Sequence, residues 1–566
     1  MVEHGGTSWH QTSRGVSILI TIYLFLFVFV MVLSKFLHDL PRLGSILPEA
    51  ALVILVGMLA GLIIDSVAGD VQADGVADDV ARSMLSFSPS IFFVVLLPPI
   101  IFNSGYHLRR DLFFRNIVPI CMYACIGTAV CTMVVASILY VCVPLFGFGF
   151  RPTFLELAAF GALISATDPV STLAVFQSKK VDPHLFYLVF GESVINDAVG
   201  LVLFECLAHL IEKQQNQLNV GQEFAQFLYD FSTGFLGSLV LGTLFAITYA
   251  LLMKHVDMRK TPFLELCVYI TMMYFPFVAA EILRLSGIVT VLFTGIASKR
   301  YVEPNVCAET AVNADIVFRL VAHLTETIIF LDLGLSVFGL VGDGAFRIVF
   351  IAFALLACLV GRAVNIYPIT YLFNMVAGRG KTIPPPTIGN EYVAEGTSRE
   401  DGVILTSPGE SMTDDSVIPW KTAHMLWFSG LRGAVSYGLA RMFPQTENQS
   451  IFIATTMFIV LTTTFVLGGA TESALQFLNI DTGVDEVKYL KHLKKKKLFF
   501  GWLSHFEDQT LRSWVLRDFD KRKLDDDGEI VEDIEEKLFY QEHIELTETE
   551  HAQVREKKGG LYDYGQ

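Results

Sequence analysis

The sequence predicts an all-α polytopic membrane protein followed by a cytosolic C-terminal tail, and three observations lead to this fold class. Of the 566 residues, 53% are hydrophobic and only 17% are charged, whereas soluble domains carry about 25% charged residues. The apolar residues form long uncharged runs between positions 16 and 472, and the charged residues gather in short gaps and near the C-terminus. The formal net charge of −16 leaves no basic footprint for nucleic acid.

The apolar runs divide into thirteen predicted spans. A helix needs about 20 residues to cross the hydrocarbon core of a bilayer. Cut to that length at charged, proline or glycine gaps, the runs are 16–36, 47–67, 85–104, 117–146, 153–176, 185–211, 224–254, 262–282, 285–299, 314–340, 346–374, 421–442 and 450–472. The division between the eighth and ninth spans requires a tight turn at 281–286.

Basic residues in the gaps predict the orientation of the chain. One alternating set of loops holds sixteen Lys and Arg residues and the other holds seven, so the richer set and the C-terminus are expected in the cytosol. The predicted organisation is a short exoplasmic or lumenal segment (1–15), a transmembrane domain (16–474) and a cytosolic tail (475–566). Residues 378–420, which include three successive prolines, are expected to form a disordered cytosolic insertion.

Two matched interruptions indicate an internal repeat. Thirteen spans can be divided into six, a connector and six, with the second set inverted relative to the first, as in many transporters. The fifth span contains Thr167-Asp168-Pro169, where the proline lacks an N–H and frees a backbone carbonyl. The twelfth span contains Ser429-Gly430-Leu431-Arg432-Gly433, where two glycines weaken the helix. We therefore expect crossed discontinuous helices at spans 5 and 12 that line a binding site.

The sixth span carries the densest set of ionisable residues, which are costly at bilayer depth. At about 100° per residue, Ser193 lies one turn from Asp197 and Glu192 one turn from Asn196, whereas Glu192 and Asp197 point about 140° apart. The two acids are therefore expected to have different roles. Asp197, with Ser193 and with Asp168 across the broken helix, offers hard oxygen ligands for a small alkali cation. Competition between this cation and a proton is sufficient chemistry for antiport.

The other charges within the spans have open assignments. Asp168 and Asp197 could instead be structural carboxylates satisfied by helix N-termini or by arginine. Glu192 is suited to neutralise a membrane arginine, and the candidates are Arg362, Arg432 and Arg319. Glu281 and Glu326 also lie within spans and are candidate pathway or pairing residues.

At these positions the sequence resembles the monovalent cation/proton antiporters, specifically the eukaryotic sodium/proton exchangers. The matching segments occur in family order over most of 85–472: LLPPIIFNSGY (96–106), LISATDPVSTLAVF (163–176), VFGESVINDAVGLVL (189–203), AAEILRLSGIVTVLFTGI (279–296), TETIIFLDLGLSVF (325–338), GRAVNIYP (361–368) and FSGLRGAVSYGLA (428–440). The motifs ATDPV, GRAVNIYP and SGLRGA are more similar to those of the organellar (Golgi or endosomal) branch than to those of the plasma-membrane branch.

The resemblance implies a homodimeric, electroneutral exchanger of Na⁺ or K⁺ for H⁺ that works by alternating access, is not an enzyme and needs no cofactor. Carried over residue by residue, it assigns the cation and proton site to Asp197, Asp168, Ser193, Asn196 and Thr167, and an ion pair to Glu192 and Arg362. It gives Pro169, Arg432, Gly430 and Gly433 the role of supporting the discontinuous helices.

Two alternatives come from other functional classes. The first is a transport-inactive membrane sensor or scaffold that acts through its tail. The second, an intramembrane aspartyl protease, requires a Gly-x-Gly-Asp sequence that fails here at Leu340. The tail is expected to bind cytosolic regulatory proteins, and its basic stretch is expected to bind anionic lipids through Lys491, Lys494, Lys495, Lys496 and Lys497.

Overall fold

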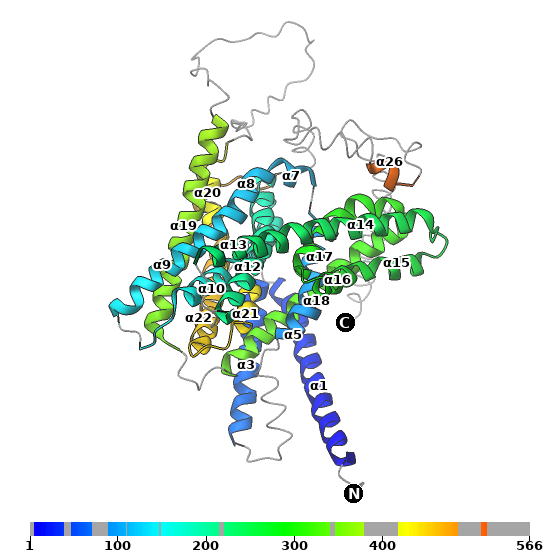
Figure 1. Cartoon of the computed structure of the whole chain (residues 1–566). Coiled ribbons are helices and arrows are strands. Elements are labelled where there is room, and N and C mark those ends of the chain that lie inside the picture. The colour runs from blue at the N-terminus through cyan, green and yellow to red at the C-terminus, as the bar shows by residue number, and fades with distance from the viewer. Residues whose placement is uncertain are drawn as a thin grey trace, which may run out of the picture.

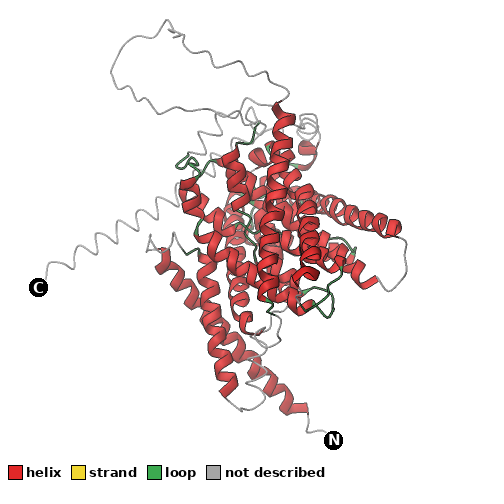
Figure 2. Ribbon diagram, turned by 90° about the vertical axis from the view of Figure 1, so that its left-hand side faces the viewer, coloured by secondary structure: helices red, strands yellow, loops and turns green. Residues whose placement is uncertain are grey.

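In a computed structural model of the chain, every secondary-structure element of the described part is a helix, which confirms the predicted fold class. It describes residues 5–38, 47–70, 89–108, 110–146, 149–213, 220–339, 346–378, 417–484 and 511–517. Figures 1 and 2 show long helices side by side in one bundle, from which α1 and α3 project at one end.

The helices of the first half follow in chain order, with short π-helical turns inside three of them. They are α1 (Gly5–His38), α3 (Glu49–Asp70), α5 (Pro89–Ile91), η1 (Phe92–Leu96), α6 (Leu97–Tyr106), α7 (Arg110–Arg115), α8 (Ile117–Cys121), η2 (Met122–Gly127), α9 (Thr128–Phe146), α10 (Phe154–Ser165), α11 (Val170–Lys179), α12 (Pro183–Lys213), α13 (Val220–Ser232), η3 (Thr233–Gly237) and α14 (Ser238–His255).

The helices of the second half end with a short one in the tail. They are α15 (Pro262–Ile270), η4 (Thr271–Met273), α16 (Phe275–Ile282), α17 (Gly287–Tyr301), η5 (Glu303–Asn305), α18 (Ala308–Gly339), α19 (Ile348–Gly378), α20 (Trp420–Phe428), α21 (Ala434–Arg441), α22 (Gln449–Thr462), η6 (Thr463–Gly468), α23 (Thr471–Phe477) and α26 (Arg512–Val515).

Most predicted spans coincide with helices, and eight helical stretches of the described residues are long and apolar enough to cross a membrane by length and composition. Two further helices, α1 and α3, contain shorter apolar stretches. The eighth and ninth spans are divided as predicted, since α16 ends at Ile282, α17 starts at Gly287 and Arg284 in the turn has φ +57°. The predicted fifth and twelfth spans are each two short helices with extended backbone between them.

The helices form two groups. The scaffold helices are α3, α6, α14, α17 and α18, in which α14 packs on α17, α17 on α6, and α18 on both α6 and α3. The site helices are α9, α10, α11, α12, α19, α20 and α21, in which α9 packs on α10 and α19, and α10 packs on α12. The scaffold helices approach closely where they carry glycine. A Cβ on Gly105 would lie 2.5 Å from the Leu292 carbonyl oxygen, so α6 and α17 pack backbone to backbone.

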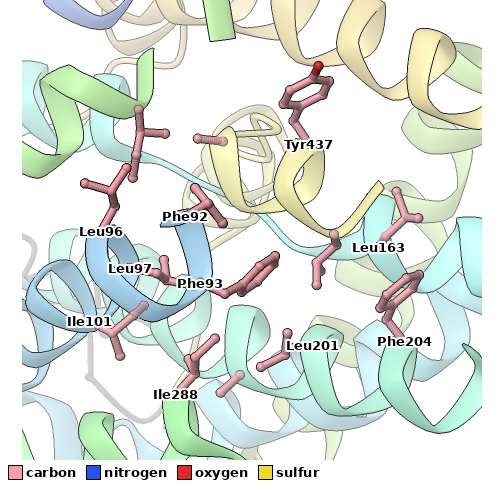
Figure 3. Packing of buried hydrophobic residues seen from close by; sticks show 14 of the residues in the cluster. Phe92, Phe93, Leu96, Leu97, Ile101, Leu163, Leu201, Phe204, Ile288 and Tyr437 are labelled. Carbon is pink, nitrogen blue, oxygen red and sulfur yellow. The ribbon is translucent and has the colours of Figure 1, made fainter. Parts of the chain in front are cut away.

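An apolar seam separates the two groups. Phe92 and Phe93 of η1 lie among Leu201 of α12 and Tyr437 of α21 in Figure 3. Phe92 and Tyr437 are essentially inaccessible to solvent. The hydroxyl of Tyr437 on α21 donates to Oγ of Ser336 on α18 at 3.1 Å, so a polar contact between a site helix and a scaffold helix accompanies the apolar ones. The two groups of helices therefore meet at a largely apolar surface, where burial of side chains gives non-directional stabilisation.

Several predicted features lie outside the described residues. They are positions 1–4 of the N-terminal segment, residues 379–416 of the predicted insertion, the five tail lysines at 491 and 494–497, and the tail after residue 517.

Candidate functional site

The two interrupted spans meet at their breaks. Helix α10 ends at Ser165, and Ala166 turns to extended backbone with ψ 127° before α11 begins at Val170. In the other span, α20 ends at Phe428 and α21 begins at Ala434. The backbone N–H of Asp168 donates to the Leu431 carbonyl at 2.9 Å, so each break supplies a partner to the other. Unpaired backbone groups inside a membrane must be satisfied in this way.

Arg432 fills the gap in hydrogen bonding that the first break creates. Its guanidinium donates to the carbonyls of Ser165, at 2.8 Å, and Ala166, at 3.2 Å. Ser436 on α21 donates to the same Ala166 carbonyl at 3.1 Å. These carbonyls belong to the C-terminal end of α10, where a cation is favourable. Arg432 is 1% exposed, so its charge interacts with groups inside the site and not with water.

The glycines of the second break allow charged groups to come close to the backbone. A Cβ on Gly433 would lie 2.0 Å from Oδ2 of Asp168, and one on Gly430 would lie 2.6 Å from Nε of Arg362. Any larger residue would push these side chains away. The Asp168 carboxylate also accepts a hydrogen bond from the N–H of Val170 at 3.2 Å, which caps the start of α11.

Glu192 and Arg362 form a buried bidentate ion pair. Nη1 of Arg362 lies 2.6 Å from Oε1 of Glu192, and Nη2 lies 2.9 Å from Oε2. The side chain of Arg362 is 4% exposed and that of Glu192 is 2% exposed. Arg362 also donates to the Leu426 carbonyl at 2.9 Å. Of the three arginines considered as partners, Arg319 instead contacts Asp315, at 3.1 Å, and His107, at 2.9 Å, on the scaffold helices. The ion pair thus links α12, α19 and α20 within the site helices.

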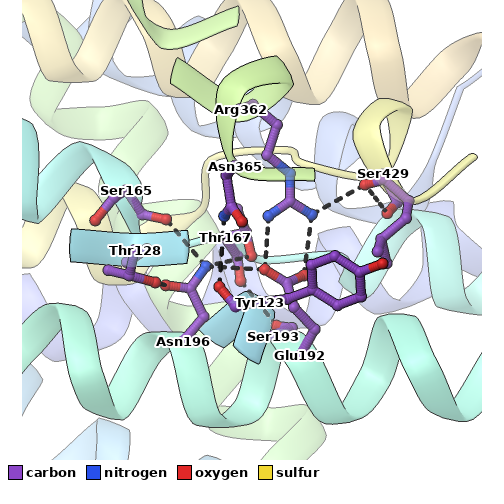
Figure 4. Close-up of polar contacts among 12 residues, drawn as sticks. Tyr123, Thr128, Ser165, Thr167, Glu192, Ser193, Asn196, Arg362, Asn365 and Ser429 are labelled. Atoms are coloured by element: carbon purple, nitrogen blue, oxygen red, sulfur yellow. Dashed lines mark hydrogen bonds and ion pairs between the residues drawn. The ribbon is translucent and has the colours of Figure 1, made fainter. Parts of the chain in front are cut away.

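Asn196 ties the sixth span to the break (Figure 4). Its amide nitrogen donates to the Ser165 carbonyl and to Oγ1 of Thr167, each at 3.1 Å, and to Glu192 at 3.3 Å. Its carbonyl oxygen accepts from Thr128 of α9 at 2.6 Å. Because both ends of the amide are engaged, Asn196 fixes the position of α12 against the extended segment 166–169. Asn196 is 1% exposed, so water cannot replace these bonds.

Asp197 has an oxygen without a hydrogen-bond partner in the described part of the chain. Its Oδ1 is buried and accepts no bond there. Asp168, Glu192 and Arg432 are its charged neighbours. Ser193, one turn earlier, donates to the Thr167 carbonyl at 2.8 Å. A buried polar atom without a partner costs free energy unless a ligand, water or proton satisfies it, so this oxygen marks a place for an exchangeable occupant.

The two acids expected along a pathway lie in different surroundings. Glu326 of α18 is close enough to Asp168 and to Glu49, at the start of α3, to interact with both electrostatically. Glu281 accepts a hydrogen bond from the N–H of Gly287 at 3.3 Å and lines a cavity of about 400 Å³ between α5, η1, α12, α16 and α17.

The same cavity is lined by Glu205, which the sequence analysis did not single out. Glu205 follows Asp197 by eight residues on α12, about 12 Å along the helix. The rule that singles out Glu192 and Asp197, an acid inside an apolar run, applies equally to Glu205 and could have found it. Thr128 carried no such signal, because an uncharged threonine in an apolar run is common. No group of three or more His, Cys, Asp or Glu side chains suited to a resident metal ion occurs in the described residues.

Comparisons with known proteins all indicate the same family. Residues 25–476 match the family model described as sodium/hydrogen exchanger, transmembrane. Sodium/hydrogen exchanger 8 of Rattus norvegicus is 36% identical over 440 residues, which cover 77% of this chain and 68% of that protein. Sodium/hydrogen exchanger 9 of Equus caballus is 33% identical over 438 residues, covering 76% and 62%.

A solved structure supports the fold. The sodium proton antiporter MjNhaP1 from Methanocaldococcus jannaschii aligns with 82% of this chain and 99% of its own, with a TM-score of 0.53 and 17% sequence identity. An electron-microscopy map of the same antiporter gives a TM-score of 0.56 at 16% identity, covering 82% and 98%. At these identities the likeness concerns the arrangement of helices.

Proposed function

Because this chain belongs to the sodium/hydrogen exchanger family, we propose that it exchanges Na⁺, or K⁺, for H⁺ across its membrane, one for one, and that the two ions compete for Asp197. Oδ1 of Asp197, which has no hydrogen-bond partner in the described part of the chain, carries the proposal. A carboxylate is a hard oxygen ligand for an alkali cation and equally a base for a proton.

The surroundings of Asp197 support a small cation site. Asp168 supplies a second carboxylate, and Ser193 and the Thr167 carbonyl supply neutral oxygens at the break. Asn196 has its amide engaged on both ends, so we assign it to positioning the break. It also leaves Asp197 as the single acid at this turn of the helix, which supports exchange of one cation for one proton.

We infer that acidic side chains line the cation's route to the site from each side of the membrane. Glu326 of α18 interacts electrostatically with Asp168 and with Glu49, at the start of α3. The cavity that holds Glu205 and Glu281 lies toward the other end of α12. We propose that these acids attract cations to the site from opposite faces, since clefts lined by one sign of charge raise the local concentration of counter-ions.

The setting of the protein follows from the sequence. The excess of basic residues in one set of loops supports a cytosolic tail. The sequences of the motifs ATDPV, GRAVNIYP and SGLRGA support a Golgi or endosomal membrane. The family resemblance supports a homodimer.

The test uses purified protein in liposomes with an internal pH dye, challenged with Na⁺ and then K⁺. We expect cation-driven proton movement in the parent protein, its loss in Asp197→Asn, and the same rate with the membrane potential clamped. Asp332→Asn is the matched control, because Asp332 of α18 accepts a hydrogen bond from Tyr23 at 2.7 Å that an asparagine oxygen retains. Equal activity of the parent and Asp197→Asn would refute the site. A silent, folded parent protein would favour a transport-inactive sensor.

A further inference from the structure

The cavity between α5, η1, α12, α16 and α17 brings two carboxylates together away from Asp197. It has a volume of about 400 Å³ and is lined by Glu205 of α12 and Glu281 of α16. Glu205 is partly buried and Glu281 is exposed, and the two acids are close enough to interact electrostatically. Phe93, Leu201 and Ile288, which lie near one another in Figure 3, form part of the wall. The two acids therefore share one cavity with a partly apolar wall.

Neither carboxylate is neutralised within the described part of the chain. No basic side chain of the described residues is among the groups that act on Glu205 or Glu281. Glu281 accepts a hydrogen bond at Oε1 from the N–H of Gly287, at 3.3 Å, and this leaves its second oxygen available. Two like charges in one cavity repel each other. A cation that neutralises both carboxylates would therefore be favoured in this cavity.

Ser286 gives an independent indication of a ligand. It lines the same cavity, is 6% exposed, and its Oγ has no hydrogen-bond partner in the described part of the chain. Ser286 occupies the N-cap position of α17, where a serine hydroxyl ordinarily accepts from a backbone N–H of the first turn, but its side chain makes no such bond. A buried polar atom without a partner costs free energy. A ligand in the cavity would supply the missing partner.

The available oxygens indicate the class of cation. Two carboxylates and a hydroxyl are hard ligands, which Ca²⁺ and Mg²⁺ prefer. These ligands come from α12, α16 and the turn before α17. Such an irregular set suits Ca²⁺, which accepts flexible geometry, better than Mg²⁺, which demands a near-ideal octahedron.

The size of the cavity and the number of acids indicate a hydrated, exchangeable ion. Each water molecule takes about 30 Å³, so a cavity of about 400 Å³ has room for Ca²⁺ together with several water ligands. Only two carboxylates are present, and few charged ligands give weak binding. We therefore expect a dissociation constant of about 10⁻⁴–10⁻³ M, as in extracellular calcium modules.

We propose that Glu205, Glu281 and Ser286 form a low-affinity Ca²⁺ site, and that bound Ca²⁺ hinders the entry of Na⁺ from this side of the protein. The second part rests on the exchange function proposed above. Glu205 lies about 12 Å along α12 from Asp197, so Ca²⁺ here leaves the exchange site free. It cancels the negative charge that concentrates Na⁺ in the cavity. Ca²⁺ therefore raises the apparent KM for Na⁺ and leaves the maximal rate unchanged.

The first test measures binding without transport, as the rise in apparent melting temperature that Ca²⁺ causes in the full-length, detergent-purified protein without Na⁺. At about 10 mM Ca²⁺, roughly ten times the weaker end of the expected range, we expect a rise of about 2 °C or more. The same concentration of Mg²⁺ should have a smaller effect.

Three variants locate the bound ion. Glu205→Gln and Ser286→Ala should lose most of the Ca²⁺-dependent rise. Ser286→Ala removes only the hydroxyl and keeps the backbone hydrogen bond to Ser238, at 2.9 Å. Glu212→Gln is the matched control, because Glu212 is an acid on the same helix whose side chain is 65% exposed and does not line the cavity. It should keep the full rise.

The second readout is exchange in liposomes with Na⁺ and Ca²⁺ supplied on the cavity side. We expect Ca²⁺ to raise the apparent KM for Na⁺ about threefold or more in the parent and in Glu212→Gln, and to leave it unchanged in Glu205→Gln.

The two readouts separate failure of the site from failure of the exchange function. A Ca²⁺-dependent rise that is absent from the parent, or retained in full by Glu205→Gln or Ser286→Ala, would refute the site whether or not the protein transports. Binding that depends on Glu205, with no effect of Ca²⁺ on KM in the parent, would refute the effect on Na⁺ entry. Such binding by a folded parent that does not exchange would support the site and refute the function on which that effect rests.

Discussion

The Glu192–Arg362 pair can be tested by a double-mutant cycle. In Arg362→Met the Glu192 carboxylate loses two hydrogen bonds, of 2.6 and 2.9 Å, and among the described residues it retains only the Asn196 contact at 3.3 Å. Both partners are at most 4% exposed, so a bare carboxylate would remain buried. Removing one partner of a buried pair costs about 3–5 kcal/mol. The double variant Glu192→Gln/Arg362→Met leaves no buried charge, and its loss should be about 1–2 kcal/mol.

The assay is heat-induced loss of the folded peak in size-exclusion chromatography of the detergent-purified protein. Arg362→Met should lower the apparent melting temperature by roughly 5 °C or more, and the double variant should recover most of the loss. Arg319→Met is the matched control, because Arg319 pairs with Asp315 where the two side chains are 65% and 30% exposed, and exposed pairs contribute under about 1 kcal/mol. A double variant as unstable as the sum of its single variants would refute the reasoning, since it would show no coupling between the two side chains.

Two further predictions concern the acidic cavity and the contact of Asp257 with Arg517 in the tail segment Leu511–Arg517, which packs on the end of α14. Glu205→Gln and Glu281→Gln should each raise the apparent KM for Na⁺ supplied from the cavity side several-fold, with little change in maximal rate, because the acids attract the cation before it reaches Asp197. Isotope uptake at varied Na⁺ concentration measures this KM. An unchanged KM in both variants would exclude the cavity from the cation route. Hydrogen bonds from Arg259, and then from Arg517, lower the pKa of Asp257. Because the folded pKa of Asp257 is lowered, its contact with Arg517 contributes full stability above the ordinary carboxylate pKa and weakens only as the pH falls through the lowered value. The Arg512–Ser513 bond, where Arg512 is 2% exposed, should therefore resist trypsin equally from about pH 5 to 8. Protection that falls between pH 7 and 5.5 would contradict this.

Much of the site could be predicted from the sequence, because its signals are charges and helix breakers within apolar runs. The helix breaks at Asp168-Pro169 and Gly430–Gly433 lie where predicted, and the structure brings their backbones together. Pairing was harder to predict. Three arginines were open partners for Glu192, since only the packing of α12, α19 and α20 decides which one reaches it.

The packing of the tail segment Leu511–Arg517 on the end of α14 carries no comparable sequence signal. Arg517 is one of many basic residues after position 490, and nothing local distinguishes an arginine that caps a distant helix from one in solvent. Its role depends on the Met253 and Lys254 carbonyls, which are set free because α14 ends there. Contacts between segments about 260 residues apart follow from tertiary packing, which a pattern of hydrophobic and charged residues does not encode.

The charges that belong to the site helices also bear on how exchange is coupled. Glu192 is neutralised by Arg362. Arg432 is a charged neighbour of Asp197, and Asp168 is the third acid at the site. With all of these groups ionised, the site helices carry three acids and two arginines at the site, an excess of one negative charge. A net charge is costly inside the membrane, so the empty site is disfavoured during a shift of the site helices against the scaffold. One Na⁺, one K⁺ or one proton removes the excess equally well, whereas none or two would not. We infer that this single uncompensated charge requires the site to be occupied on every passage and makes the exchange one for one.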